Sequence, residues 1–270
     1  MKRKTLHDYF HKEAKPAVDE CTSHGADSPK KPKSRLGPSG ETRGLLNKSD
    51  LSVPGLSVLQ SFVSPVEQAT LLAFLDSQTW RTDLSRRTKH YGGTYCLMPS
   101  ATATPAERAA ISQTIVTAPP IAPELHWLIE RMVSRAIYAP TARPEFCIVN
   151  EYLRPHGISA HVENFRFGEP VCSLTLGSGD FMRFHELAAP HDGSVRSGAA
   201  AKAPRTGKRV DVWLPSGSLC VLRGKARYQW QHEIMRGRRG RVGEGWRRVS
   251  LTFRVEKGKT TATADMRAKE

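Results

Sequence analysis

Beyond residue 140 the sequence divides into short apolar runs separated by turn residues, and this pattern most constrains the fold. Gly and Pro bound the runs at residues 177–179 and 215–217. Short apolar runs between such turn residues are typical of β-strands. Many short strands behind a helical layer predict a double-sheet jelly roll. The predicted strands cover residues 146–152, 171–176, 180–184, 210–214, 218–223 and 247–255.

Two helices are expected before these strands. Residues 64–67 (SPVE) form a capping box with Pro at the first helical position, and leucines follow at helical spacing, so a helix is predicted over residues 65–78. A second amphipathic helix is predicted over residues 123–138. Residues 186–209 are rich in Ala, Gly, Ser and Arg and are expected to form a long loop. The predicted class is α+β: a double-stranded β-helix (jelly roll) with supporting helices on one face.

Composition separates this domain from its flanks. Residues 1–50 are rich in Lys, Ser, Pro and Gly, which predicts a disordered basic tail. The folded domain is expected at residues 51–256, followed by a disordered tail at 257–270. The chain has 41 Lys and Arg against 26 Asp and Glu, a formal net charge of +15. This charge favours a polyanionic partner, with nucleic acid ahead of an acidic membrane surface.

The five cysteines are scattered and form no C-x-x-C pair, which argues against a disulfide framework and a structural zinc site. Cys147, Cys172 and Cys220 lie in apolar runs and are expected to be buried free thiols. No run of 18 apolar residues predicts a membrane span, and the N-terminus lacks the apolar core of a signal peptide. We expect a monomer in the nucleus, with the cytoplasm as a second location.

The N-terminal tail contains two short motifs. Leu6, Tyr9 and Phe10 have the spacing of anchors on one helical turn. Their segment resembles the peptide that eukaryotic replication and repair proteins insert into the sliding clamp, although Arg3 stands where Gln is usual. The alternative is an apolar end of a disordered tail. Residues 29–35 form a basic cluster of the nuclear-import type.

The last predicted strand has one apolar and one polar face, because side chains alternate with period two. The polar face carries Arg248, Ser250, Thr252 and Arg254. Such a face either meets solvent or lines a cavity for an anion. Asn150 and Tyr152 share a face of the run 146–152 and offer amide and phenol donors.

Histidine and carboxylate residues suggest a metal site. His161 and Glu163 are two residues apart, so their side chains can converge, and His232 follows much later. Two histidines and one carboxylate form the facial triad of non-haem Fe(II) oxygenases, which leaves positions open for a bidentate co-substrate and O₂. A dicarboxylate co-substrate needs its far end held, and the planar fork of arginine suits that task.

The order of these motifs resembles the AlkB family of dioxygenases. The matching segments are Asn150–Tyr152, His161–Glu163, Ser173–Ser178, Arg227–His232 and Arg248–Arg254. Residues 86–95 resemble the hairpin that these enzymes place over their substrate. The likeness spans residues 55–256 and is nearer to the eukaryotic tRNA-modifying branch than to the bacterial founder.

The resemblance implies a function and a set of site residues. The implied catalytic metal ligands for Fe(II) are His161, Glu163 and His232. Arg248 would pair with the distal carboxylate of 2-oxoglutarate, and further co-substrate contacts would come from Asn150, Tyr152 and Arg254. The implied substrate contacts are Tyr91, Tyr95 and Arg227. The chain would be an Fe(II)/2-oxoglutarate-dependent dioxygenase that demethylates or hydroxylates alkylated DNA or RNA bases taken out of the stack.

Glu163 departs from the family, which usually has Asp at this position. Glutamate is one methylene longer and must bend back to meet the metal, although it serves in the related jumonji-type oxygenases. Two alternatives therefore stay open: the same chemistry on a protein or small molecule, and a catalytically weak nucleic-acid-binding adaptor. The cationic run Arg236–Arg241 is either a solvated loop or a phosphate-binding turn.

Overall fold

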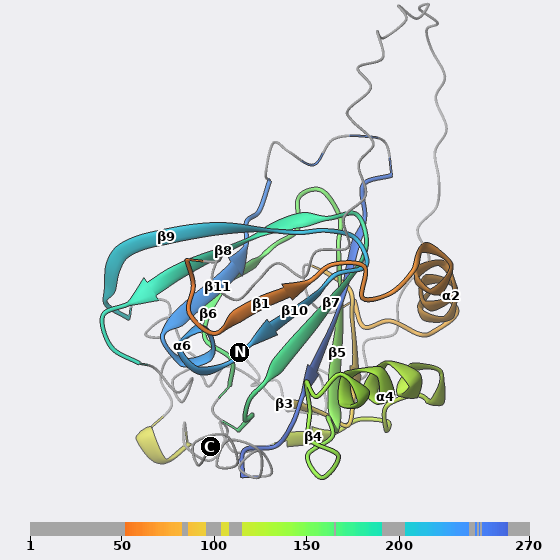
Figure 1. Cartoon of the computed structure of the whole chain (residues 1–270), viewed down its shortest axis with the longest axis horizontal. Helices are drawn as coiled ribbons and strands as arrows, with labels where there is room; N and C mark the ends of the chain where they lie inside the picture. The colour runs from red at the N-terminus through yellow and green to blue at the C-terminus, as the bar shows by residue number, and fades with distance from the viewer. Residues whose placement is uncertain are drawn as a thin grey trace, which may run out of the picture. The chain divides into compact units, whose positions relative to one another are not determined.

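Two antiparallel sheets face each other in the computed structural model (Figure 1). It describes residues 52–82, 86–95, 104–107, 115–164, 166–190, 203–237, 241, 243 and 245–258, so both tail motifs lie outside the described residues. The larger sheet has the order β1-β10-β7-β12-β5-β2 and the smaller β6-β11-β8-β9. This arrangement confirms the predicted jelly roll.

The strands of the larger sheet are β1 (Leu56–Leu59), β2 (Thr88–Tyr91), β5 (Phe146–Tyr152), β7 (Val171–Gly177), β10 (Leu219–Leu222) and β12 (Arg248–Arg254). The smaller sheet contains β6 (Ile158–His161), β8 (Asp180–Leu187), β9 (Arg205–Leu214) and β11 (Trp230–Ile234). A short hairpin-like pair joins β3 (Gly93–Tyr95) and β4 (Ile115–Thr117).

The larger sheet has buried side chains on both faces. One face packs against the helices, and from β12 it contributes Val249, Leu251 and Phe253 to a core shared with Leu71 and Leu128. The other face looks toward the smaller sheet, where a second core forms between the layers. All four polar side chains of β12 are buried there, and Arg248 is only 1% exposed. The polar face of β12 therefore does not meet solvent, which was one of the two interpretations, and it lines the interior of the jelly roll.

The two predicted helices cover the outer face of the larger sheet (Figure 1). Helix α2 (Pro65–Asp76) begins with the predicted capping box, in which Ser64 and Glu67 bond each other's backbone N–H groups. A 3₁₀ turn, η1 (Pro123–Leu125), leads into α4 (His126–Ser134). The second helix ends before residue 138 because Ala136 takes a left-handed conformation with φ of 53°. Short helix α6 (Gly224–Tyr228) precedes β11.

Charged side chains around the buried Glu151 join α2 to the larger sheet. Glu151 of β5 accepts hydrogen bonds from Arg87 and from Nε of Arg247, the latter at 2.6 Å. Arg247 also donates to Asp76 at the end of α2, over 2.8 Å from Nη1. The two arginines hold the pKa of Glu151 below its usual value despite its burial. This network lies on the helix side of the sheet, opposite the interior.

Some element boundaries differ from the predictions. Residues 186–209 are not one loop, because β8 continues to Leu187 and β9 begins at Arg205; residues 191–202 lie outside the described part. Strands β1, β4, β6 and β11 were not predicted as strands. Residues 86–95, which resemble a hairpin, contain β2 and β3, but β2 pairs with β5 and β3 pairs with β4. Cys147, Cys172 and Cys220 are buried and free, as expected. Within the described ranges, none of the helices has the length and apolar character needed to cross a bilayer.

Candidate active site

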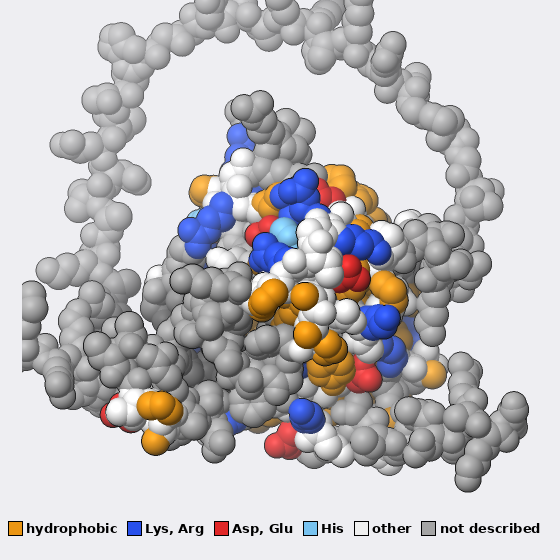
Figure 2. All heavy atoms as spheres, turned by 90° about the vertical axis from the view of Figure 1, so that its left-hand side faces the viewer, with side chains coloured by type: hydrophobic (Ala, Val, Ile, Leu, Met, Phe, Trp, Pro, Cys, Tyr) orange, Lys and Arg blue, Asp and Glu red, His pale blue; other side chains and the backbone are white. Residues whose placement is uncertain are grey.

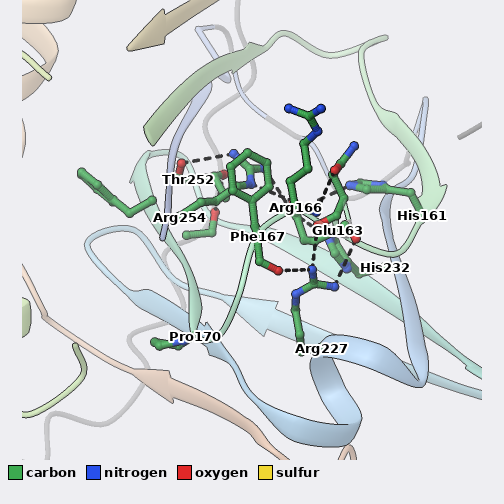
Figure 3. Close-up of polar contacts among 12 residues, drawn as sticks. His161, Glu163, Arg166, Phe167, Pro170, Arg227, His232, Thr252 and Arg254 are labelled. Atoms are coloured by element: carbon green, nitrogen blue, oxygen red, sulfur yellow. Dashed lines mark hydrogen bonds and ion pairs between the residues drawn. The ribbon is translucent and has the colours of Figure 1, made fainter. Parts of the chain in front are cut away.

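Strands β6 and β11 bring the two predicted histidine ligands together. His161 and His232 lie directly opposite each other in the antiparallel pair, so both side chains point to the same face. Their ring centroids are 4.4 Å apart. Glu163 follows just beyond β6, and its Oε1 lies 3.5 Å from His232 Nε2 and 4.0 Å from His161 Nε2. One ligand atom from each residue falls within 4.8 Å of the others, so the triad can share one metal ion (Figure 3).

The protonation of His161 suits metal binding. Its Nδ1 lies 2.8 Å from the Ser159 carbonyl oxygen, which can only accept, so Nδ1 carries the proton and Nε2 keeps its lone pair. Desolvation at the site and the neighbouring His232 lower the pKa of His161. The imidazole is therefore neutral near pH 7, the form that binds a metal ion.

Glu163 is ionised because of Arg254. Burial alone would raise the pKa of this carboxyl group, but the charge of Arg254 and the hydrogen bonds of His232 and Arg254 hold the pKa well below its usual value. Arg254 donates from Nε to Oε2 over 2.7 Å and from Nη2 to Oε1 over 3.1 Å. Arg254 therefore contacts the metal triad through the carboxylate of Glu163 (Figure 3). The longer side chain thus spans from the arginine to the two imidazoles.

Arg227, which was predicted to contact substrate, is buried and uses its guanidinium to support the segment that carries Glu163. It is 1% exposed. Its guanidinium donates to the backbone carbonyls of Glu163, Asn164 and Phe167 over 3.1, 2.9 and 2.9 Å (Figure 3). These bonds fix the segment that follows His161. The sequence could not distinguish a buried arginine from a substrate-binding one. All three acceptors are backbone carbonyls, which every residue type has, so no sequence motif marks them.

Arg248 is a buried cation that lacks an anionic partner. Its Nη2 donates to Thr175 Oγ1 over 3.0 Å, and its guanidinium lies 5.2 Å from the Tyr152 ring centroid. Its Nε is buried without a hydrogen bond, and within the described residues no carboxylate forms an ion pair with it. Burial lowers its pKa, but arginine stays protonated in proteins. A buried unpaired charge is costly, so this site fits a carboxylate ligand.

Asn150 and Tyr152 line the same interior. On β5 they lie opposite Ser250 and Arg248 of β12, respectively. Asn150 is 6% and Tyr152 3% exposed. Arg86, which was noted only as part of a hairpin, donates from Nε to Asn150 Oδ1 over 2.9 Å. Three of the predicted co-substrate residues, Asn150, Tyr152 and Arg248, are therefore brought together on neighbouring strands of the larger sheet, whereas Arg254 pairs with Glu163.

Tyr91 lies on the wrong face to contact substrate. It pairs with Cys147 in the register of β2 and β5, whereas Asn150 pairs with Thr88. Tyr91 is therefore on the helix side, buried in the first core. Burial raises the pKa of its hydroxyl. The predicted contact is wrong for Tyr91, and the side chain of Tyr95 lies outside the described part.

The cationic run near residue 240 is also partly structural. Arg241 is buried and donates to the carbonyls of Arg154 and Met235 over 2.6 and 2.8 Å. It also pairs with Asp180 at 2.9 Å and stacks on Trp246. Arg241 therefore ties the turn before β6 to the end of β11, and it cannot bind phosphate.

Comparison with known proteins identifies this combination of fold and triad. Residues 55–254 match the model of the 2OG-Fe(II) oxygenase superfamily. The chain belongs to this superfamily. It is 26% identical over 219 residues to the Alkylated DNA repair protein ALKBH8 homolog of Arabidopsis thaliana, which covers 76% of the chain. It is 28% identical over 196 residues to the tRNA (carboxymethyluridine(34)-5-O)-methyltransferase ALKBH8 of Mus musculus, which covers 67% of the chain.

The chain is thus an AlkB-like 2OG-Fe(II) oxygenase, but it is shorter than these relatives. It spans 59% of the Arabidopsis protein and 24% of the mouse protein. The solved structure of OsALKBH1 is similar with a TM-score of 0.50 and 18% identity, over 74% of this chain and 98% of that one. That likeness supports the shared fold alone. Fe(II) and 2-oxoglutarate are the cofactors of the superfamily, and the His-Glu-His triad fits the metal.

Proposed function

We propose that the chain is an Fe(II)/2-oxoglutarate-dependent dioxygenase that demethylates or hydroxylates alkylated bases in nucleic acid. Two observations carry the chemistry. The His161-Glu163-His232 triad converges, and Arg248 is a buried cation with which no carboxylate of the described residues forms an ion pair. A metal ion would complete the triad, and a dicarboxylate that chelates this ion would also neutralise Arg248. With both bound, iron and 2-oxoglutarate supply the oxidation of a substrate C–H bond.

The residues of the chain would bind and orient the co-substrate and exclude water from it. Arg248 would hold the distal carboxylate, with Thr175 Oγ1 fixing the guanidinium. Asn150 would donate from its amide to the co-substrate, and Tyr152 would pack beside it. The apolar core between the sheets, with Phe184 and Trp230 fully buried, keeps this end of the site dry. A dry site strengthens the charge pairing of Arg248 with a carboxylate.

Nucleic acid is the proposed substrate class for two reasons. The relatives are named for alkylated DNA repair and for tRNA uridine, and the chain carries a net charge of +15. Figure 2 shows Lys and Arg side chains in several places on one face of the molecule, with acidic side chains beside some of them. Residues 205–209 of the edge strand β9 add Arg205, Lys208 and Arg209 to the exposed surface. Such a surface attracts phosphates.

The test is succinate formation by purified protein with Fe(II), 2-oxoglutarate, ascorbate and methylated DNA or RNA oligonucleotides. Arg248→Ala should lower turnover by about 100-fold or more, since removing one partner of a buried ion pair costs about 3–5 kcal/mol. Arg247→Ala is the matched control, because the neighbouring arginine points to the opposite face and pairs with Glu151 and Asp76. Equal succinate from wild type and Arg248→Ala contradicts the proposal.

The substrate class is tested separately by salt. If phosphates are bound, oligonucleotide affinity should fall steeply as salt rises, because the slope counts the counterions released. Two results together favour the same chemistry on a protein or small molecule. Oligonucleotides would not raise the rate of succinate formation, and they would not bind at low salt.

A further inference from the structure

A second arginine lies beside the co-substrate end of the site. Arg86 precedes β2 and is partly buried. Its Nε donates to Asn150 Oδ1 over 2.9 Å, and its guanidinium lies 5.9 Å from the centroid of the Tyr152 ring. Arg248 lies 5.2 Å from the same centroid. The aromatic residue of the predicted co-substrate pair therefore contacts two guanidinium groups.

The bond from Arg86 decides which way the Asn150 amide points. A guanidinium has donors and no acceptor, so the amide atom that faces it must be the oxygen. The amide nitrogen then points away from Arg86. Within the described part of the chain, no residue accepts a hydrogen bond from that nitrogen, although Asn150 is only 6% exposed. Thr88, opposite Asn150 in the β2–β5 register, also has a buried hydroxyl oxygen without a partner.

We propose that Arg86 is a positioning residue that locks Asn150 with its amide N–H groups available to the bound 2-oxoglutarate. This inference rests on the proposed function, because it assigns Asn150 to the co-substrate. Without Arg86 the amide could rotate and present its oxygen to a carboxylate, which repels it. An acceptor facing an anion loses a hydrogen bond and gains an unfavourable contact.

The neighbouring arginine provides the control. Arg87 leaves the chain on the opposite face and donates from Nη2 to Glu151 Oε1 over 2.8 Å. It belongs to the network that joins α2 to the sheet, so Arg87→Ala should lower the melting temperature and leave co-substrate affinity unchanged. Arg86→Ala should lower co-substrate affinity and leave the melting temperature unchanged. A role confined to packing would give both variants the same signature.

The experiment is calorimetric titration of 2-oxoglutarate into the full chain loaded with Mn²⁺, a redox-inert substitute for Fe(II). We expect Arg86→Ala to raise Kd roughly tenfold, in line with one lost hydrogen bond to a charged group. Arg86→Lys, which retains a donor, should recover part of the affinity. In an Asn150→Ala background the Arg86→Ala change should have little further effect, because Arg86 acts through Asn150.

The outcomes separate this inference from the function on which it rests. Failure of wild-type protein to bind 2-oxoglutarate, or binding unaffected by Arg248→Ala, overturns the proposed function itself. If wild type binds, Arg248→Ala does not, and Arg86→Ala binds like wild type, only the role of Arg86 is overturned. An equal loss from Arg86→Ala with and without Asn150 shows a direct contact to the ligand and contradicts positioning.

Discussion

At the scale of single residues, the length of Glu163 matters because its carboxylate serves two neighbours. It pairs with both Nε and Nη2 of Arg254 while Oε1 stays 3.5 Å from His232 Nε2. On this backbone, an aspartate would carry its carboxylate one methylene farther from one of these partners. The glutamate that departs from the usual family residue is therefore accommodated by the position of Arg254, and it does not by itself indicate loss of the metal site.

Arg227 gives a prediction that separates support from substrate binding. Arg227→Met removes three hydrogen bonds to the carbonyls of Glu163, Asn164 and Phe167. The Asn164 carbonyl still accepts from the backbone N–H of Phe167, so the buried carbonyls of Glu163 and Phe167 bear most of the loss. We expect it to lower the free energy of unfolding by about 2–4 kcal/mol, since each unsatisfied buried group costs about 1–3 kcal/mol and the segment relaxes in part. Urea unfolding measures this. Full stability combined with weaker substrate binding would instead restore the role first predicted for this residue.

At the scale of elements, α2 depends on an ion pair as well as its cap. Arg131 of α4 donates to Glu67 Oε1 over 2.6 Å. The hydrogen bond from Arg131, followed by that from the Ser64 backbone, lowers the pKa of Glu67 from 4.5 to about 2. Because the folded-state pKa is depressed, the stabilisation is present above the unfolded-state pKa and is lost as pH falls through the folded-state value.

Glu67→Gln tests this pairing while retaining a capping-box side chain. At pH 7 we expect the variant to be less stable by about 1 kcal/mol, because both partners are partly exposed and solvent screens the pair. The difference should shrink as pH falls from 4.5 toward 2. Denaturant unfolding of both proteins over this range measures it. A difference that stays constant with pH would assign the loss to packing instead.

Helices and strands that are marked by a pattern of neighbouring residues were predictable from sequence, and those without such a pattern were not. The Ser64–Glu67 box and the alternation in β12 depend on neighbours within a few residues, so they could be read directly. Strands β6 and β11 are short and contain the polar residues of the site, which hides their period. Their pairing is set by contact between strands far apart in sequence.

At the scale of the whole molecule, strand register decides which predicted site residues meet. The triad, Asn150, Tyr152 and Arg248 were predictable because motif order and alternation agree. The face of Tyr91 depends on the register of β2 against β5, and the burial of Arg227 depends on where α6 packs. Neither can be derived from spacing along the chain, because both result from long-range contacts.

The jelly roll places the metal ligands on the smaller sheet and its adjoining segment, and the cation for the co-substrate on the larger sheet. The site therefore exists only when both sheets are packed. This explains why the interior face of β12 can keep four polar side chains buried. The fold thus places the candidate metal ligands and Arg248 on different sheets, an arrangement that suits a dicarboxylate held at both ends.

The most direct test of this account is anaerobic titration of the purified chain with Fe(II). We predict one Fe(II) per wild-type chain and loss of that binding in Glu163→Ala and in His232→Ala. Glu233→Ala is the matched control, because this glutamate pairs with His185 outside the triad and should leave iron binding intact. Wild-type protein that binds no Fe(II), or binding that survives both triad substitutions, would contradict the assignment of the metal centre.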